Sequence, residues 1–305
     1  MDRTAPLPCS LRQLQYLVAV ADLGGFRKAA DACHVSQPSL SAQIAQVEQA
    51  LGVQIFERDR RRVRLSAAGA PIVDQARQVL LAMRDLTDIA RRQGNPLGGT
   101  VRIGVIPTVC PYLLPDVTPA LARDLPDLTI VWREEKTDGL IRAVTSGALD
   151  GAILALEGDL PGMAHEVIGL DRFVLAAAPG HPLVKSSRPA TAETLEGARV
   201  LLLEDGHCFR DQALAVCARA GATEEGFRAT SLSTLVQMVG RANGGVTLLP
   251  ALAVPVENRR GQLAVRPFTR AGPSRTLAMI WRKGSAMATP LKAVAASVRR
   301  QVGRG

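Results

Sequence analysis

Hydrophobic residues recur every three or four positions along the first fifty residues, in three runs separated by glycines or a polar turn. The first run starts after Ser10, a natural helix N-cap, and is broken at Gly24. The second covers Phe26–Cys33, and the third follows a second capping serine, Ser36, and ends at Gly52. The pattern predicts three short helices, with a tight turn between the second and the third.

The third of these helices leaves a polar and mostly uncharged face, which is typical of a helix that reads base edges. Glutamine and serine both donate and accept hydrogen bonds, as the DNA major groove requires. The positions expected to contact DNA are Ser36, Gln37, Pro38, Ser39, Ser41 and Gln43. A basic stretch follows and predicts a hairpin wing that contacts phosphates through Arg58, Arg60, Arg61, Arg62 and Arg64. A generic helical domain with a solvated basic loop is the alternative that spacing leaves open.

Residues 70–92 form a longer amphipathic stretch with one apolar stripe, composed of Ile72, Val73, Ala76, Val79, Leu80, Met83, Leu86 and Ile89. Such a stripe is typical either of a two-stranded coiled coil or of a helix packed on its own domain. The glycine- and proline-rich segment 94–99 predicts a hinge after this helix.

Strand-like and helical runs alternate beyond the hinge, which predicts βαβ units around a mostly parallel sheet. The first series has strands at 100–106, 128–134 and 151–156, with helices at 113–124 and 139–146. The second has strands near 173–178, 199–203, 227–229 and 245–249, with helices after residue 208 and at 232–240. A strand at 276–281 and a helix at 290–300 complete the chain. Two α/β lobes with a ligand cleft between them are expected.

Cys208 and Cys217 lie nine positions apart in a segment that predicts a helix starting near His207, capped by Asp205 or Gly206. The positive end of this helix and the nearby Arg210 are expected to favour the thiolate of Cys208. Nine helical residues span about 13 Å, whereas a disulfide needs Cα atoms within roughly 7 Å. Oxidation would therefore remodel the helix, as in a redox switch.

Composition narrows the class of protein. The chain has 305 residues, 47% hydrophobic and 21% charged, typical of a globular protein of two or three domains. A net charge of +9 permits nucleic-acid binding. Because neither a signal peptide nor an apolar run of about 20 residues is found, we expect a cytoplasmic protein without a membrane partner. The five cysteines do not suggest a disulfide framework, and no metal, cofactor or enzyme motif is recognised.

The segment A-A-D-A-C-H-V-S-Q-P-S-L-S-A-Q-I-A-Q-V-E-Q-A-L-G-V-Q-I-F-E-R resembles the winged helix-turn-helix of LysR-type transcriptional regulators, a match that covers about residues 10–70. The resemblance implies an α+β multidomain chain that binds double-stranded DNA. Its parts would be a winged helix-turn-helix domain (1–69), a dimerising linker helix with hinge (70–95) and a two-lobed, periplasmic-binding-protein-like effector domain (96–305). Lobe I would cover about 97–170 and 275–305, and lobe II about 171–274. The family also implies a homodimer through the linker helix and a homotetramer.

Four further segments resemble the peroxide-sensing OxyR branch of this family: E-D-G-H-C-F-R-D-Q-A-L-A-V-C, A-T-S-L-S-T-L-V-Q-M-V, G-V-T-L-L-P-A-L-A-V-P and I-P-T-V-C-P-Y-L-L-P. The resemblance implies that hydrogen peroxide oxidises Cys208 to a sulfenic acid, which condenses with Cys217. The pocket would be lined by Thr108, Thr137, His207 and Arg275, while Arg210 and Asp211 tune the thiol or hold the reduced loop.

Such a regulator would control antioxidant genes in the nucleoid, acting with RNA polymerase and reset by a thiol reductant. Two alternatives remain at this point. One is a LysR-type regulator that binds a metabolite in the inter-lobe cleft, and the other is a thiol peroxidase or another enzyme.

Overall fold

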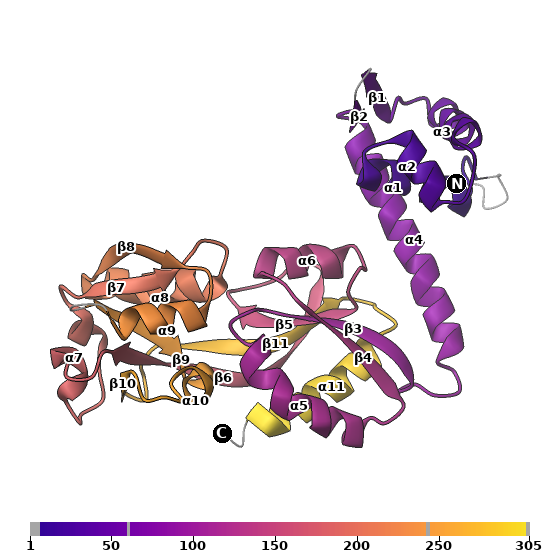
Figure 1. Ribbon diagram of the computed structural model, residues 1–305. Coiled ribbons are helices and arrows are strands. Elements are labelled where there is room, and N and C mark those ends of the chain that lie inside the picture. Colours follow the sequence, from indigo (N-terminus) through magenta and orange to yellow (C-terminus); the bar gives the residue numbers. More distant parts are fainter. Residues whose placement is uncertain (1–6, 60–61, 242–244, 303–305) are drawn as a thin grey trace. The chain divides into compact units, whose positions relative to one another are not determined.

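The structure is a computed structural model that describes residues 7–59, 62–241 and 245–302. The chain forms two compact units, Met1–Ala90 and Arg91–Gly305 (Figure 1). Each unit has its own apolar core.

The N-terminal unit contains the three helices and the hairpin that the sequence predicts. Its elements are α1 (Leu11–Leu23), α2 (Phe26–Ala32), α3 (Gln37–Leu51), β1 (Phe56–Asp59), β2 (Arg62–Leu65) and α4 (Gly69–Arg91). Ser10 caps α1 in a capping box with Gln13, and the Ser36 hydroxyl accepts from the Ser39 amide at the start of α3. Both serines therefore perform the capping role expected of them.

One glycine is required by the packing of this unit. A Cβ atom at Gly69 would lie 2.1 Å from the carbonyl oxygen of Ile55, so no other residue fits where α4 begins against the chain before β1. Ile55 and Phe56 are themselves buried with Leu40 and Ile44 of α3. The hairpin is thereby attached to the same core as the helices.

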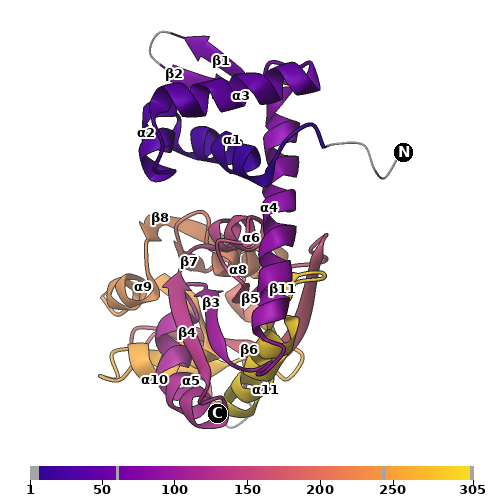
Figure 2. The same ribbon diagram turned by 90° about the vertical axis from the view of Figure 1, so that its right-hand side faces the viewer.

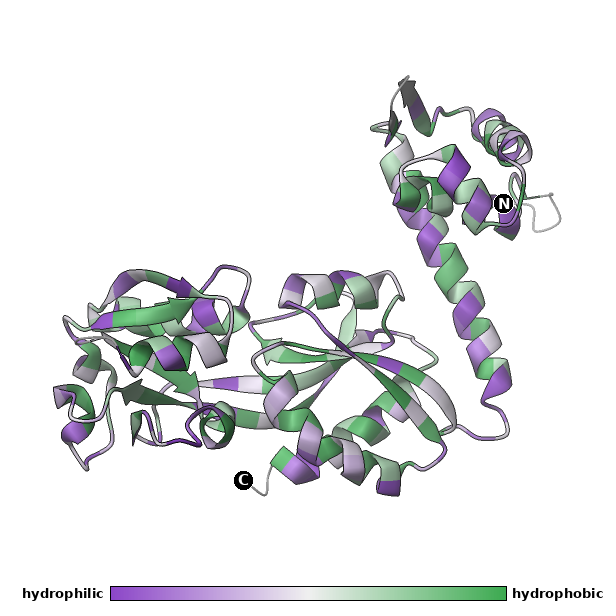
Figure 3. Cartoon of the chain, viewed as in Figure 1, coloured by the Kyte–Doolittle hydropathy of each residue, from purple (hydrophilic) through white to green (hydrophobic). Residues whose placement is uncertain are grey.

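The apolar residues of helix α4 are buried near its start and exposed toward its end. Ile72 and Val73 pack against the core of the N-terminal unit, whereas Met83, Leu86 and Ile89 are exposed, at 42%, 59% and 53%. Figure 3 shows hydrophobic and hydrophilic bands alternating along this helix. The start of α4 thus fits a helix packed on its own domain. Its exposed end fits the other alternative, one strand of a two-stranded coiled coil.

The C-terminal unit is built on one nine-stranded sheet, with strand order β4-β3-β5-β11-β6-β9-β7-β8 and with β10 paired to β6. Lobe I comprises β3 (Gly99–Val105), α5 (Cys110–Asp124), β4 (Leu128–Glu134), α6 (Thr137–Thr145), β5 (Gly151–Leu156) and α11 (Ala288–Val302). In this lobe α6 covers one face of the sheet, and α5 and α11 cover the other (Figures 1 and 2).

Lobe II contains four of the strands and several short helices. Its elements are α7 (Pro182–Lys185), η1 (Ala192–Leu195), β7 (Arg199–Leu203), α8 (Cys208–Ala220), β8 (Thr223–Ala229), α9 (Leu232–Val239), β9 (Gly245–Pro250), η2 (Ala251–Ala253), α10 (Val254–Glu257) and β10 (Ala264–Pro267). The short helices α7, η1, η2 and α10 and the strand β10 were not predicted from sequence.

Two long strands join the lobes. β6 (Met163–Ala177) runs from lobe I into lobe II, and β11 (Ser274–Arg282) returns the chain. The sequence placed the first of these only near 173–178. The prediction of a mostly parallel sheet is wrong at this crossing, because β11 is antiparallel to both β5 and β6, and β6 is antiparallel to β9.

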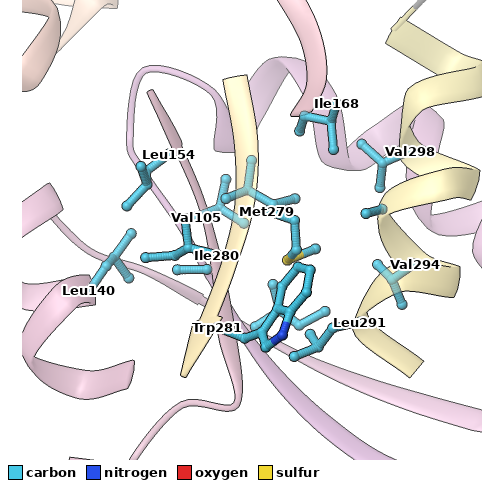
Figure 4. Packing of buried hydrophobic residues seen from close by; sticks show 14 of the residues in the cluster. Val105, Leu140, Leu154, Ile168, Met279, Ile280, Trp281, Leu291, Val294 and Val298 are labelled. Carbon is cyan, nitrogen blue, oxygen red and sulfur yellow. The ribbon is translucent and has the colours of Figure 1, made fainter. Parts of the chain in front are cut away.

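The C-terminal unit has two apolar cores, one in each lobe. In lobe I, Met279 and Trp281 of β11 lie opposite Leu291, Val294 and Val298 of α11 (Figure 4). Each lobe also contributes one buried residue to the core of the other lobe. Cys208, on a lobe II helix, is buried in the lobe I core, and Tyr112, on a lobe I helix, is buried in the lobe II core.

Candidate functional site

Cys208 is the first residue of α8 and follows the loop that leaves β7. The helix begins where the sequence predicted, but its N-cap is His207, whose side chain makes no capping hydrogen bond. The expectation of a cap at Asp205 or Gly206 is therefore wrong. The Asp205 carboxylate is instead bound by Arg210 and Arg228, and Gly206 takes a left-handed conformation (φ 89°).

Three segments that are distant in sequence surround the Cys208 side chain. The lining residues are Ile106, Pro107, Thr108, Lys136, Thr137, Gly206, His207 and Cys208. They follow β3, precede α6 and precede α8, so both lobes contribute. The pocket is closed around the thiol and leaves no room for a water-sized molecule.

His207 Nε2 in this pocket is buried without a hydrogen-bond partner among the described residues, and the buried Thr137 Oγ1 has no partner there other than the Cys208 thiol. A buried polar group without a partner is costly and marks a ligand or catalytic position. Burial, followed by the charge of Lys136, lowers the pKa of His207, while a hydrogen bond to the Thr230 backbone acts in the opposite direction. The ring is therefore neutral near pH 7.

The Cys208 thiol is 6% exposed, and burial raises its pKa. The Thr137 side chain, the charge of Arg275 and the Phe209 amide lower the pKa, but by less. The helix end acts in the predicted direction, through the Phe209 amide, but the predicted net preference for the thiolate is wrong for this conformation. Desolvation of the thiol raises its pKa by more than these interactions lower it. The Arg210 guanidinium binds groups other than the thiol.

Arg275 lies directly behind the pocket rather than in its lining. The side chain is fully buried, and its Nε donates to Asp171 Oδ2 at 2.9 Å. Its Nη1 donates to Thr108 Oγ1 at 2.7 Å and its Nη2 to the Thr108 carbonyl at 2.9 Å. The guanidinium also lies over the Phe209 ring, 5.4 Å from its centroid. Arg275 therefore fixes Thr108 and leaves the threonine hydroxyl hydrogen free to donate.

Arg210 holds the loop between β7 and α8. Nε donates to Asp205 Oδ1 at 2.9 Å, Nη1 donates to the Leu203 carbonyl at 2.8 Å, and Nη2 donates to Glu224 Oε2 at 3.0 Å. Of the two roles expected of this arginine, the contacts favour holding the reduced loop. Asp211 is exposed, and its charge adds to burial, the larger cause, in raising the pKa of Glu157.

Cys217 lies in the lobe II core, and burial raises the pKa of its thiol to about 11. Both cysteines are free thiols on an unbroken helix. The nine-residue separation then corresponds to about 13 Å along the axis. Disulfide formation requires that Cys208 leave the lobe I core and that α8 change.

Sequence reasoning missed three residues of this region. Lys136 was passed over although it directly precedes Thr137, and Glu204 directly follows β7. Asp171, the partner of Arg275, is 104 positions away from it and carried no local signal. Of the remaining cysteines, Cys110 packs against the lobe I core, and burial together with Glu134 raises its pKa to about 12.

The expected DNA-contacting residues are only partly described. Ser36, Gln37, Pro38 and Ser39 are exposed on the first turn of α3, and Ser41 is half-buried. Gln43 is engaged within the domain, because its Oε1 accepts from Gln13 Nε2 at 3.0 Å. Arg64 is exposed on β2, and the backbones of Arg58 and Arg62 belong to β1 and β2. Arg60 and Arg61 lie outside the described residues.

Within residues 7–59, 62–241 and 245–302, no group of three histidine, cysteine or acidic side chains is arranged to hold a metal ion. No helix in the same ranges is long and apolar enough to cross a membrane.

Comparison with known proteins places both units in one family. Residues 11–70 match the bacterial regulatory helix-turn-helix of the lysR family, and residues 94–303 match the LysR substrate binding domain. The "Hydrogen peroxide-inducible genes activator" of Dickeya chrysanthemi is 44% identical over 95% of each chain. The "DNA-binding transcriptional dual regulator OxyR" of Escherichia coli K12 is 43% identical over 95% of each chain.

Solved structures agree with this placement. A full-length OxyR variant from Pseudomonas aeruginosa, with a cysteine replaced by aspartate, superposes with a TM-score of 0.78 at 33% identity, covering 96% of each chain. A cysteine variant of Corynebacterium glutamicum OxyR with hydrogen peroxide bound superposes with a TM-score of 0.66 at 31% identity, covering 98% of this chain and 94% of that one. The present chain belongs to the LysR family of bacterial transcriptional regulators, in its OxyR branch.

Proposed function

We propose that this chain is a DNA-binding transcriptional regulator that senses hydrogen peroxide through Cys208 and switches antioxidant genes when Cys208 and Cys217 form a disulfide. One observation carries the proposal. A buried thiol lies in one pocket with two buried polar atoms, at the start of a helix that carries a second cysteine. Thr137 Oγ1 interacts with the thiol itself, and His207 Nε2 has no hydrogen-bond partner among the described residues. Relatives named for hydrogen peroxide induction support the same effector.

The chemistry proceeds in two balanced steps. The Cys208 sulfur, as thiolate, attacks one peroxide oxygen; the O–O bond breaks, and the departing hydroxide takes a proton to become water. Cys208 is then a sulfenic acid, oxidised by two electrons. The Cys217 sulfur attacks the Cys208 sulfur next, the S–O bond breaks, and a second water leaves as the S–S bond forms.

The pocket residues act on the first step. The Thr108 and Thr137 hydroxyls donate to the peroxide oxygens and stabilise the charge that develops on the departing one. His207 Nε2, with the other ring nitrogen engaged by the Thr230 backbone, accepts a peroxide hydrogen. Because the pocket is closed in this structure, peroxide entry requires a small displacement of these side chains.

The proposed partners follow from the family. The first turn of α3 and the arginines of the hairpin contact double-stranded operator DNA. The exposed apolar half of α4 pairs with a second copy, and sensor domains assemble dimers into a homotetramer. The protein acts in the cytoplasm at the nucleoid, alongside RNA polymerase, and a thiol reductant system resets it.

The two alternatives are less well supported. A cavity of about 800 Å³ between α5 and α10 is lined by residues of both lobes and contains neither cysteine. A metabolite bound there would act without Cys208, whereas the relatives reported above are named for hydrogen peroxide or OxyR and not for a metabolite. An enzyme would need turnover, whereas Cys208 reacts once per signal and awaits reduction.

A promoter-fusion experiment tests the proposal. Cys208→Ser should abolish the transcriptional response to micromolar peroxide while operator binding is retained. Cys217→Ser should leave sulfenic or over-oxidised sulfur on Cys208, visible as one or more added oxygens by intact mass. A full peroxide response in Cys208→Ser cells with normal protein levels would place the switch elsewhere.

A further inference from the structure

Lys136 joins the two lobes at the edge of the thiol pocket. It is the N-cap residue of α6 in lobe I. Its Nζ donates to Glu204 Oε1 at 2.6 Å and to the Asp205 carbonyl at 3.2 Å. Glu204 and Asp205 belong to the loop of lobe II that leads from β7 to Cys208. A cation of one lobe therefore holds both a side chain and the backbone of the segment that delivers the reactive cysteine from the other.

The hydrocarbon stem of the lysine packs on the same loop. A Cβ atom at Gly206 would lie 3.3 Å from Lys136 Cδ, so the stem already lies close against the loop backbone. Gly206 has φ 89°, which few other residues adopt. The fit of Lys136 thus depends on the particular backbone path that the loop takes in the dithiol form.

The far side of the loop is anchored within lobe II. Asp205 receives Arg210 Nε on Oδ1 and Arg228 Nη1 on Oδ2, both at 2.9 Å. Glu224 receives the same two arginines, Arg210 Nη2 and Arg228 Nε, at 3.0 Å. Asp205 is therefore fixed by its carboxylate from lobe II and by its carbonyl from lobe I.

The charge of Lys136 acts on the loop rather than on the sulfur. Arg275 is the cation that lowers the pKa of Cys208, whereas Lys136 lowers the pKas of His207 and Glu204. Removing Lys136 would therefore change how the loop is held more than how readily the thiol ionises.

We propose that Lys136 is a positioning residue that clamps the Glu204–Asp205 loop across the lobes and so favours the dithiol over the disulfide form. The proposal rests on the proposed function. Cys208 must leave the lobe I core to reach Cys217, so the loop before it must abandon the path on which both Lys136 contacts depend. The clamp therefore sets how much oxidant is needed to move the switch.

The expected size of the effect follows from exposure. Lys136 and Glu204 are 38% and 39% exposed at their side chains, so their ion pair contributes modestly. Loss of the clamp should shift the dithiol–disulfide equilibrium about threefold to tenfold toward the disulfide. For a two-electron couple this corresponds to roughly 15 to 30 mV.

The test is redox titration of the full-length protein in glutathione buffers, following Cys208–Cys217 by mass spectrometry. In this exchange one oxidised glutathione is reduced to two thiols as the disulfide forms. Lys136→Met should titrate at a more reducing poise than wild type, Lys136→Arg should restore most of the difference, and Lys292→Met, an exposed lysine on α11, should have no effect. The neutral pair Lys136→Met with Glu204→Gln should match Lys136→Met, because the tether rather than net charge is lost.

The outcomes separate the two proposals. If wild type forms no Cys208–Cys217 disulfide, the proposed function fails. If wild type forms it but Lys136→Met titrates within about a factor of 1.5 of wild type, only the clamp is overturned. A restored wild-type equilibrium in the neutral pair would also overturn it, since charge alone would then explain the single variant.

Discussion

At the scale of single residues, the reactivity of Cys208 depends on groups that compensate for its burial. Thr137 is the clearest candidate to test, because its hydroxyl is buried and its one described interaction is with the Cys208 thiol, whose pKa it lowers. Thr137→Val keeps the shape and removes the donor. We expect the rate of Cys208 oxidation by peroxide to fall at least about tenfold, since a lost transition-state donor typically costs more than that. Rapid-mixing kinetics followed by intact mass would measure it.

Thr145 provides a matched control on the same helix. It is exposed, and its hydroxyl donates to the Ile141 carbonyl at 2.8 Å. Thr145→Val should leave the rate unchanged. Equal rates in Thr137→Val and wild type would remove Thr137 from the peroxide pocket.

The pKa of Cys208 leads to a second prediction. Because burial raises the pKa of this thiol, the protonated form predominates at neutral pH and the reactive thiolate is a small fraction. The oxidation rate should therefore rise with pH from 7 to 9, by up to about tenfold per unit while the thiol remains mostly protonated. Cys217→Ser should show the same profile, since only Cys208 meets peroxide. A plateau already reached at pH 7 would mean that the thiolate is favoured, as the sequence alone suggested.

Some features of these residues could be predicted from the sequence, and others could not. Thr108 and His207 stand in short motifs that contain a cysteine, whereas Thr137 was predicted from the family resemblance alone. The sign of the Cys208 pKa shift was missed because it depends on burial by lobe I, which no local pattern reveals. The partnership of Arg275 with Asp171 arises from two strands that cross between lobes, and such a pair has no sequence signature.

At the scale of elements, α8 must exist in two forms. It is continuous from Cys208 to Ala220 in the dithiol state, and a disulfide between its first and tenth residues is incompatible with that geometry. We expect backbone amides of residues 208–217 to exchange hydrogen at least about tenfold faster in the disulfide form, while those of α6 change little. Hydrogen exchange with mass spectrometry would measure this.

The Cys217→Ser variant tests whether the disulfide itself causes the faster hydrogen exchange. Its Cys208 is oxidised by peroxide but finds no second sulfur, so α8 should remain protected. Unchanged protection in wild type, with the disulfide verified by mass, would require that the lobes rather than the helix move.

Secondary structure could be predicted from the sequence where one face of an element is buried and the other is exposed. The three helices of the DNA-binding domain have clear apolar positions, α1 and α3 have capping serines, and the predicted bounds were nearly correct. β6 was predicted only in its fully buried second half. Its first half alternates between exposed and half-buried residues around Gly169 and passes between lobes, so it lacks the continuous apolar run of a central strand. Pairing direction is set by the chain's return through β11, which is a property of the whole domain.

At the scale of the whole molecule, the proposed dimer pairs through the apolar residues of α4 that are exposed. Val79, Met83, Leu86 and Ile89 recur at helical spacing, and all are more than a third exposed. Each such side chain contributes roughly 1.5–3 kcal/mol when fully buried. Leu86→Gln combined with Ile89→Gln should therefore raise the dimer dissociation constant at least about a hundredfold, measurable by sedimentation equilibrium.

Asp88 supplies the control, because it lies between these positions in sequence and on the opposite side of the helix. Asp88→Asn should leave the dissociation constant within about twofold of wild type. Loss of dimerisation in the double variant should also weaken operator binding, since two helix-turn-helix units are then no longer delivered together. A double variant that stays dimeric at nanomolar concentration would show that the sensor domains alone hold the assembly. Any signal from Cys208 would then reach DNA by a route that does not depend on pairing through α4.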